Sequence, residues 1–276
     1  MTVGSSPELR TDGSRGSGGA SARPRLRQVV SRLTLVAIFA SLAVLLSGCE
    51  VFSSPQNTFS PSGTVAKDQK DILMLTLWPA LAILVLVEGL LVFILLRFRR
   101  TKNSDVLPKQ THGNNKLEIG WTVAPIILLA FFIPPTISGI VDLGRTPKDA
   151  MVVQVNGFQW NWGFEYPQPD GTTIRAPIGS PPSAPTELHI PINKKIELRL
   201  HALDVIHSFW VPKLAGKTDV IPGRENHMWI EGTEIGTFSG ECAEFCGIGH
   251  ATMRFVVVVQ SEEDFQAWLK QQAAAK

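Results

Sequence analysis

Two long apolar stretches dominate the first half of the chain, over residues 72–96 and 119–141. Each is longer than the roughly 20 residues that an α-helix needs to cross the hydrocarbon core of a bilayer. Three prolines interrupt the second stretch, and we expect them to kink the helix or to end it early. These are Pro125, Pro134 and Pro135. The pattern predicts a hairpin of two transmembrane helices over residues 72–141.

The hydrophobic pattern changes after residue 142. Short apolar runs occur at residues 151–155, 195–200 and 255–259, and turn-forming segments rich in Pro and Gly separate them. Such runs are typical of β-strands. Many short strands within about a hundred residues predict a β-sandwich or a Greek-key barrel over residues 142–276. A short helix from Glu262 to the end is expected to close this domain.

The loop between the two apolar stretches, residues 97–118, is basic. It contains six basic residues and two acidic ones, namely Arg97, Arg99, Arg100, Lys102, Lys109 and Lys116 against Asp105 and Glu118. Loops that are rich in Lys and Arg remain on the cytoplasmic side of the membrane. The loop is therefore predicted to be cytoplasmic, which places the C-terminal domain outside the cell.

The N-terminus has the pattern of a secretory signal. Arginines up to Arg32 precede an apolar run over residues 33–46, and Ser47-Gly48-Cys49 follows. This arrangement predicts a lipoprotein-type signal peptide over residues 1–48, with cleavage before Cys49 and lipidation of its thiol. Residues 49–71 then form an extracytoplasmic leader. An uncleaved membrane anchor is the alternative, and the long polar start also fits a misassigned start codon.

The charge of the chain is unevenly distributed. The whole sequence is formally +2, but the predicted mature chain is −2, because residues 1–48 carry six arginines and only two acidic residues. The segment from Asp142 onward carries sixteen acidic and twelve basic residues. This balance argues against nucleic acid as a partner and is compatible with a basic protein partner.

Candidate metal-binding residues are concentrated near the end of the chain. The order Cys-x3-Cys-x3-His-x2-Met covers Cys242, Cys246, His250 and Met253, and His207 lies upstream. Thiolates, imidazoles and a thioether are soft or borderline ligands, and their combination favours copper. A disulfide and a Cys2His2 zinc site are the alternatives. The thioether and the distant His207 favour copper over both.

Both ligand segments closely resemble cytochrome c oxidase subunit II, a family whose outer domain holds a dinuclear copper A centre. The resemblance implies a cupredoxin-like Greek-key fold. It also implies two bridging thiolates and a ligand set of His207, Cys242, the backbone carbonyl of Glu244, Cys246, His250 and Met253. His207 and Met253 would complete one copper, and His250 and the Glu244 carbonyl the other. The Glu244 carboxylate is also a candidate ligand for magnesium shared with subunit I.

An aromatic segment from Gly157 to Tyr166 adds to this resemblance. Its rings could simply pack in the core, but the segment is similar to the family's Gly-x-Gln-Trp-Tyr-Trp motif. In the family, the first Trp accepts the electron from docked cytochrome c. Trp160 takes that position here, and Asn161 stands where the family usually has Tyr.

Two carboxylates are also assigned roles, Asp204 from the acidic balance of the domain and Glu118 from the family resemblance. Asp204, three residues before His207, is expected to contribute to docking of the electron donor. Glu118, at the start of the second span, would lie at the mouth of a proton-uptake channel into subunit I. The alternative is that Glu118 caps the helix, where the dipole favours a negative charge.

These features together imply the subunit through which electrons enter an aa3-type cytochrome c oxidase of a bacterial cell membrane. Cytochrome c would donate electrons, and subunit I would reduce oxygen to water with proton translocation. Other oxidase subunits and membrane lipid would be the further partners. A quinol oxidase subunit II shares the architecture but lacks the copper ligands. A lipoprotein copper chaperone needs neither a second span nor Met253.

Overall fold

The computed structural model describes residues 34, 36–41, 54–99, 110 and 112–275. It divides into two units, Met1–Glu50 and Val51–Lys276. In the first unit, Thr34 and residues 36–41 are helical, within the apolar run of the predicted signal peptide. Cys49 and the expected cleavage site lie outside the described residues, so lipidation stays a prediction.

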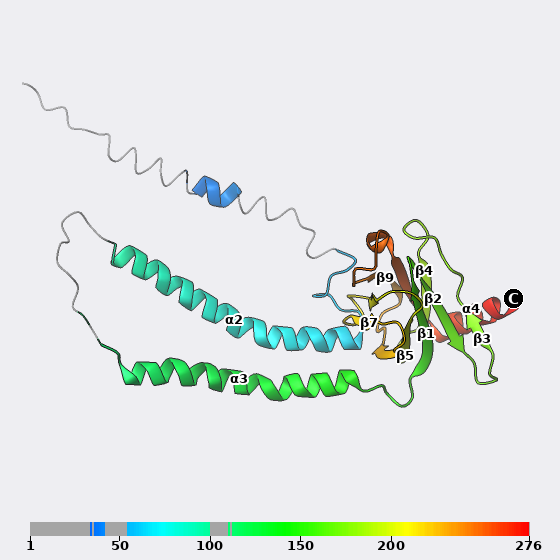
Figure 1. The fold of residues 1–276 in the computed structure, drawn as a ribbon, viewed down its shortest axis with the longest axis horizontal. Coiled ribbons are helices and arrows are strands. Elements are labelled where there is room, and N and C mark those ends of the chain that lie inside the picture. The colour runs from blue at the N-terminus through cyan, green and yellow to red at the C-terminus, as the bar shows by residue number, and fades with distance from the viewer. Residues whose placement is uncertain (1–33, 35, 42–53, 100–109, 111, 276) are drawn as a thin grey trace, which may run out of the picture. The chain divides into compact units, whose positions relative to one another are not determined.

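The second unit begins with the expected pair of long helices, α2 (Thr64–Arg97) and α3 (Asn115–Gly144) (Figure 1). Within the part of the chain that the structure describes, these two helices have the length and the apolar composition required to cross a membrane. The two helices contact each other, as the two arms of a hairpin do. The structure confirms the predicted helical hairpin.

The helices differ from the expectation in their ends. Helix α2 begins eight residues before the apolar stretch, at Thr64, and α3 extends to Gly144. Of the two expected effects of the prolines, an early end of the second helix is not observed, since α3 runs through all three of them. Helices in membranes tolerate proline because neighbouring groups satisfy the backbone carbonyls that it leaves unpaired.

The rest of the second unit is a domain of two five-stranded sheets, counted over the described residues (Figure 1). The first has the order β3-β2-β1-β5-β8, with β1 (Met151–Phe158), β2 (Asn161–Pro167), β3 (Thr173–Arg175), β5 (Ile196–Ala202) and β8 (Asn226–Ile230). The second has the order β4-β10-β9-β6-β7, with β4 (Thr186–Pro191), β6 (His207–Trp210), β7 (Thr218–Val220), β9 (Gly236–Cys242) and β10 (Arg254–Gln260). Strands β1 and β5 are parallel, as are β4 and β10, and the other pairs are antiparallel. The three expected strands correspond to β1, β5 and β10. Helix α4 (Glu262–Ala274) follows and is capped by Ser261, which confirms the closing helix.

The core lies between the two sheets and is centred on aromatic side chains. Trp162 lies edge-on to Phe209 and Phe255, with ring centroids 5.6 and 5.3 Å apart. Aromatic pairs prefer such edge-to-face geometry because the ring edge is positive and its face is negative. The Trp162 ring also lies 6.0 Å from the imidazole of His207. The packed centre of the sandwich therefore supports one side of the candidate metal site.

The start of α2 is joined firmly to the β-domain. The amide of Ser62 donates to the carbonyl of Lys213 at 2.8 Å, and that of Ala66 to Leu214 at 3.1 Å. The Thr64 hydroxyl donates to the carboxylate of Glu231. Because Ala66 is also buried, the first turn of the helix is part of the domain.

Candidate metal centre

Strand pairing brings the separate ligand segments together. His207 is the first residue of β6, and Cys242 is the last residue of β9, which pairs with β6. The amide of Cys242 donates to the carbonyl of Met253 at 3.0 Å, which closes the loop between β9 and β10. The amide of Ala243 donates to Ser208 at 2.9 Å. These bonds place side chains from β6, from β9 and from the loop between β9 and β10 around one point.

The six donor groups are gathered around the two thiol sulfurs. The two thiol sulfurs, Cys242 Sγ and Cys246 Sγ, are 3.8 Å apart. Cys242 Sγ lies 3.9 Å from His207 Nδ1 and 3.2 Å from the Glu244 carbonyl oxygen. Around the other thiol, Cys246 Sγ lies 3.7 Å from His250 Nδ1 and 3.7 Å from Met253 Sδ. Thiols, imidazole nitrogens, a thioether and a carbonyl thus line one small space.

The chemistry of this donor set fits copper. Both cysteines are free thiols and both are buried, as are His207 and Met253. The donor atoms of His207, Cys242 and Cys246 all lie within 4.8 Å of one another. The free thiols argue against the disulfide alternative. A buried thioether beside two thiols argues for copper over zinc, because structural zinc is held by thiolates and imidazoles without methionine.

The protonation of the two thiols differs because of their surroundings. Burial raises the pKa of Cys242, but hydrogen bonding to His207 and to backbone groups outweighs it and brings the pKa to about 7. Burial and the negative charge of Cys242 raise the pKa of Cys246 to about 12. Cys242 is therefore the more readily ionised of the two thiols. A second thiolate requires added positive charge, which a bound metal cation supplies.

Asp204 lies directly behind His207. Its Oδ1 is 2.9 Å from His207 Nε2, and its two oxygens also accept from the amides of Val205 and Gln159. Burial raises the pKa of Asp204, but these hydrogen bonds lower it below the ordinary value overall. Burial lowers the pKa of His207, whereas Cys242 and Asp204 raise it above the ordinary value overall. A carboxylate in this place fixes the tautomer of the imidazole and directs Nδ1 toward the metal site.

Trp160 joins the metal loop to the surface. Its Nε1 donates to the carbonyl of Cys246 at 3.3 Å, and the Gln159 side-chain amide donates to the same oxygen at 2.8 Å. The ring packs so closely on Gly249 that a Cβ there would lie 2.5 Å from it. Trp160 remains 37% exposed. The indole thus has one side against a ligand-bearing loop and the other toward solvent, and the sequence alone did not indicate the contribution of Gln159.

Exposed apolar side chains accompany the ligands in sequence. Leu203 and Ile206 precede His207, and Phe245 and Ile248 lie within the loop between the ligands. Phe245 is 77% exposed and Ile248 is 98% exposed. Such side chains beside a candidate metal site are typical of a surface that contacts a partner.

Asn161 holds a neighbouring loop in place. Its Nδ2 donates to the carbonyl of Gly179, and its Oδ1 accepts from the Thr186 hydroxyl, each at 2.8 Å. The Thr186 hydroxyl in turn accepts from the amide of Gly179 at 3.0 Å. The proline-rich loop before β4 is thereby fixed beside the turn that carries Trp160. A tyrosine could not form this pair of bonds, which gives a structural reason for asparagine here.

Glu118 is not part of the metal centre, because it lies in the first turn of α3, at the opposite end of that helix from the β-domain (Figure 1). Its Oε1 accepts from the amide of Asn114 at 3.2 Å, while the Asn114 side chain accepts from the amides of Lys116 and Leu117. This reciprocal arrangement resembles a capping box, with the carboxylate one residue later in the helix than in the usual motif. The carboxylate of Glu244 is exposed, next to the metal loop.

Comparison with known proteins identifies two matched regions. The family model for the transmembrane domain of cytochrome c oxidase subunit II matches residues 54–137. The family model for the periplasmic domain of the same subunit matches residues 183–261. The two matches cover the helical hairpin and the part of the β-domain that holds all six donor groups.

Complete proteins show the same relationship. Cytochrome c oxidase subunit 2 of Alkalihalophilus pseudofirmus is 37% identical over 84% of this chain and 66% of its own length. That of Bacillus subtilis is 34% identical over 88% of this chain and 69% of its own length. Quinol oxidase subunit 2 of Bacillus spizizenii is 31% identical over 86% of this chain and 71% of its own length. Overall similarity therefore extends to both cytochrome c oxidases and quinol oxidases. The presence of the donor groups is then the feature that can distinguish the two classes.

The role of Asn161 can be tested by hydrogen exchange. In Asn161→Ala, we expect amides of residues 176–186 to exchange roughly thirtyfold faster, because two hydrogen bonds of about 1 kcal/mol each are lost. Asn156→Ala is the matched control, since the structure gives the Asn156 side chain no hydrogen bond to a described residue. Equal exchange of the loop in both variants would contradict the assignment.

Proposed function

The chain belongs to the cytochrome c oxidase subunit II family, and on this premise we propose that it is the subunit through which electrons enter an aa3-type cytochrome c oxidase. As a family member it is a membrane protein with an extracytoplasmic C-terminal domain and with oxidase subunits as partners. The observation that carries the proposal is the convergence of two thiols, two imidazoles, a thioether and a carbonyl beneath Trp160.

The proposed cofactor is a pair of copper ions, which when bound supplies a one-electron acceptor whose charge is shared between both metals. The thiolates of Cys242 and Cys246 would hold both ions. His207 and Met253 would serve one of them, and His250 and the Glu244 carbonyl the other. The strands on both sides hold these groups in place, so little movement accompanies a change of charge. The exposed Glu244 carboxylate is proposed as a magnesium ligand shared with subunit I.

Trp160 is proposed as the point at which an electron reaches the protein. Its exposed edge can contact a docked donor, while its Nε1 is bonded to the backbone of Cys246 at 3.3 Å. The hydrogen bond provides a short path from the surface to a thiolate ligand. Gln159 bonds to the same carbonyl and so helps to hold the indole and the ligand loop together.

The proposed donor is cytochrome c. The exposed apolar side chains of Phe245 and Ile248 would exclude water from the contact around Trp160. The acidic balance of the domain would attract a basic donor over longer distances, an effect that salt screens. Asp204 is proposed to contribute to docking, and its bond to His207 gives it a second role in orienting that ligand.

Subunit I would reduce oxygen to water and couple this to proton translocation, so this chain alone would have no oxygen-reductase activity. Glu118 is proposed to lie near the cytoplasmic start of a proton channel into subunit I. Its capping bond supports a structural role for the same carboxylate. The two roles are compatible, because the residue is exposed and only one of its oxygens has a described bond.

The two alternatives fit the site less well. A quinol oxidase subunit II needs no copper ligands, whereas all six donor groups converge here. A copper chaperone must release its metal, but Met253 is fully buried under the loop. The copper content of the purified chain separates the three: two ions for the proposed function, about one for a chaperone and none for a quinol oxidase.

Cys246→Ser tests the bridged site. We expect it to abolish the shared-electron signature in electron paramagnetic resonance, because a hydroxyl does not replace a bridging thiolate. Cys49→Ser is the matched control: the spectrum should remain that of the wild type, and mass spectrometry should show the loss of N-terminal lipid. A wild-type spectrum in Cys246→Ser would count against the site, and an unmodified Cys49 in the wild type would count against lipidation.

Trp160→Gln tests the path of the electron. Stopped-flow reduction by cytochrome c should slow by more than about tenfold at saturating donor, which corresponds to a barrier higher by over about 1.4 kcal/mol. Donor affinity and the copper spectrum should change little. Ile248→Gln should show the reverse pattern, with weaker binding and a near-normal saturating rate. Wild-type kinetics in Trp160→Gln would place the path elsewhere.

Asp204→Asn separates docking from ligand orientation. If the carboxylate orients His207, the copper spectrum should shift and copper affinity should fall by roughly 10–100-fold, as for other partners of metal ligands. If it also docks the donor, the on-rate should become less sensitive to salt. Asp219→Asn removes an equal charge from an exposed position on β7 and should leave the spectrum unchanged. An unchanged spectrum in Asp204→Asn would leave docking as its only role.

A further inference from the structure

The outer face of the first sheet carries a cluster of two histidines and two glutamates. Strands β5 and β8 pair antiparallel there, and β8 is an edge strand of the sheet. The Nε2 of His201 lies 2.8 Å from one oxygen of Glu225, and the Nε2 of His227 lies 3.2 Å from the other oxygen. On the far side of the second imidazole, His227 Nδ1 lies 3.1 Å from Glu197 Oε1. The cluster shares no residue with the candidate metal centre.

The imidazole of His227 has a carboxylate oxygen at each of its two nitrogens. A neutral imidazole has a single N–H, and its other nitrogen offers a lone pair. The N–H belongs on the Glu197 side, because that carboxylate is only 12% exposed and a buried acceptor needs a donor. The Nε2 lone pair then faces an oxygen of Glu225 across 3.2 Å. Two acceptors in this position require a cation between them, either a proton or a metal ion.

The spacing of the three side chains suits a zinc ion. Two atoms that bind one tetrahedral zinc at about 2.0–2.2 Å lie about 3.4 Å apart. The two contacts of Glu225, at 2.8 and 3.2 Å, are close to that separation. Because the three side chains are 34–43% exposed, they can rotate so that the carboxylate turns aside and both Nε2 atoms reach one ion. Two imidazoles and one carboxylate are a ligand set that zinc uses with water in the fourth position.

Glu197 supplies a second feature of a zinc site with histidine ligands. A histidine that binds a metal through one nitrogen almost always donates its other N–H to a carboxylate, a carbonyl or water. Glu197 occupies this place behind His227, and Arg199 Nε donates to the same oxygen at 3.4 Å. The carboxylate thereby fixes the tautomer that leaves Nε2 of His227 bare toward Glu225.

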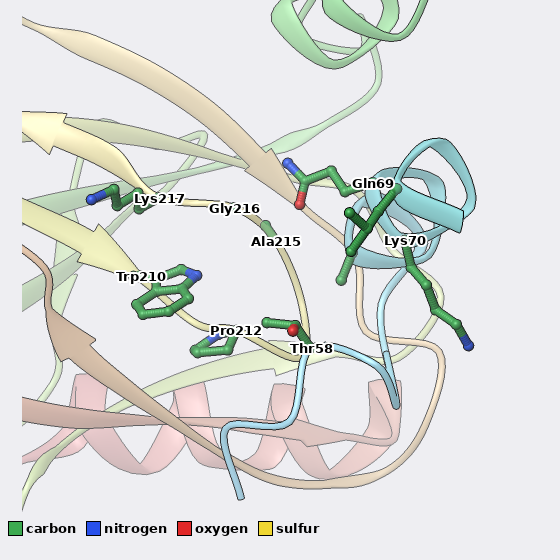
Figure 2. A pocket seen from close by; sticks show the side chains of 10 residues that line it. Thr58, Gln69, Lys70, Trp210, Pro212, Ala215, Gly216 and Lys217 are labelled. Atoms are coloured by element: carbon green, nitrogen blue, oxygen red, sulfur yellow. The ribbon is translucent and has the colours of Figure 1, made fainter. Parts of the chain in front are cut away.

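A cavity of about 240 Å³ adjoins His227 and gives room for a water ligand. Its wall includes Trp229 of β8, Val65 near the start of α2 and Leu143 near the end of α3. Gln69 and residues 215–217 line both this cavity and a neighbouring, mainly apolar pocket of about 430 Å³ (Figure 2). The cluster therefore lies where the edge strand of the sheet meets the outer ends of the two helices.

We propose that His201, Glu225 and His227 bind one zinc ion, with water as the fourth ligand and with Glu197 orienting His227. The ion takes the place of the proton at His227 Nε2, and that proton is released to solvent. His201 carries its own proton on Nδ1 and directs its bare Nε2 to the ion. The bound ion joins the edge strand β8 to β5 beside the ends of α2 and α3.

Zinc uptake by the copper-loaded full chain, purified without a histidine tag, tests the proposal. Competition with a chromophoric chelator should show one tight equivalent of zinc per chain, while the copper spectrum remains unchanged. X-ray absorption at the zinc edge should show nitrogen and oxygen ligands at about 2.0–2.2 Å and no sulfur at about 2.3 Å. Magnesium at the same concentration should not compete, because it prefers six oxygen ligands.

Substitutions identify the ligands. His201→Gln and His227→Gln should each remove the tight equivalent, whereas His112→Gln, at an exposed histidine outside the β-domain, should keep it. Glu197→Gln should keep the stoichiometry of one but lower the zinc affinity by roughly 10–100-fold, as expected for a residue that positions a ligand. The copper spectrum verifies that each variant is folded. Absence of zinc uptake by the wild type, uptake that survives both histidine substitutions, or sulfur among the zinc ligands would overturn the proposal.

Discussion

The hydrogen bond between the amide of Cys242 and the carbonyl of Met253 is the constraint on which the rest of the site depends. It ties the end of β9 to the start of β10 and so folds the intervening loop back on itself. Within that loop, Cys246 and His250 can then face Cys242, and β6 adds His207 through its pairing with β9. The donor groups are positioned by main-chain bonds, which do not depend on a bound metal.

A second layer of contacts connects this site to the surface. Asp204 receives hydrogen bonds from the backbone of Gln159 and contacts the outer nitrogen of His207. The next residue, Trp160, bonds to the carbonyl of Cys246. One short turn therefore contacts both ligand segments, so any displacement of the turn changes the surroundings of both. Residues that are not themselves ligands thus contribute to the geometry of the site.

The features that were predictable from the sequence are those encoded locally. The helical hairpin follows from the length of two apolar runs, and the ligand motif follows from four donors within twelve residues. The early start of α2 was not visible, because burial of Val65 and Ala66 against the domain stabilises a turn that has no apolar run. The contact of Asp204 with His207 was hidden for a related reason. The spacing places the two residues near each other, but the direction of the carboxylate depends in part on the amide of Gln159, 45 residues away. The bonds of Asn161 to Gly179 and Thr186 likewise join segments whose distance in sequence carries no signal.

The firm junction between α2 and the β-domain has a mechanical consequence. A transmembrane helix adapts to a thinner or thicker bilayer chiefly by changing its tilt. Because the first turn of α2 is bonded to Lys213 and Leu214, a change in the tilt of α2 has to rotate the β-domain together with the helix. The angle at which the indole of Trp160 faces the aqueous phase is thus set in part by the thickness of the membrane beneath it.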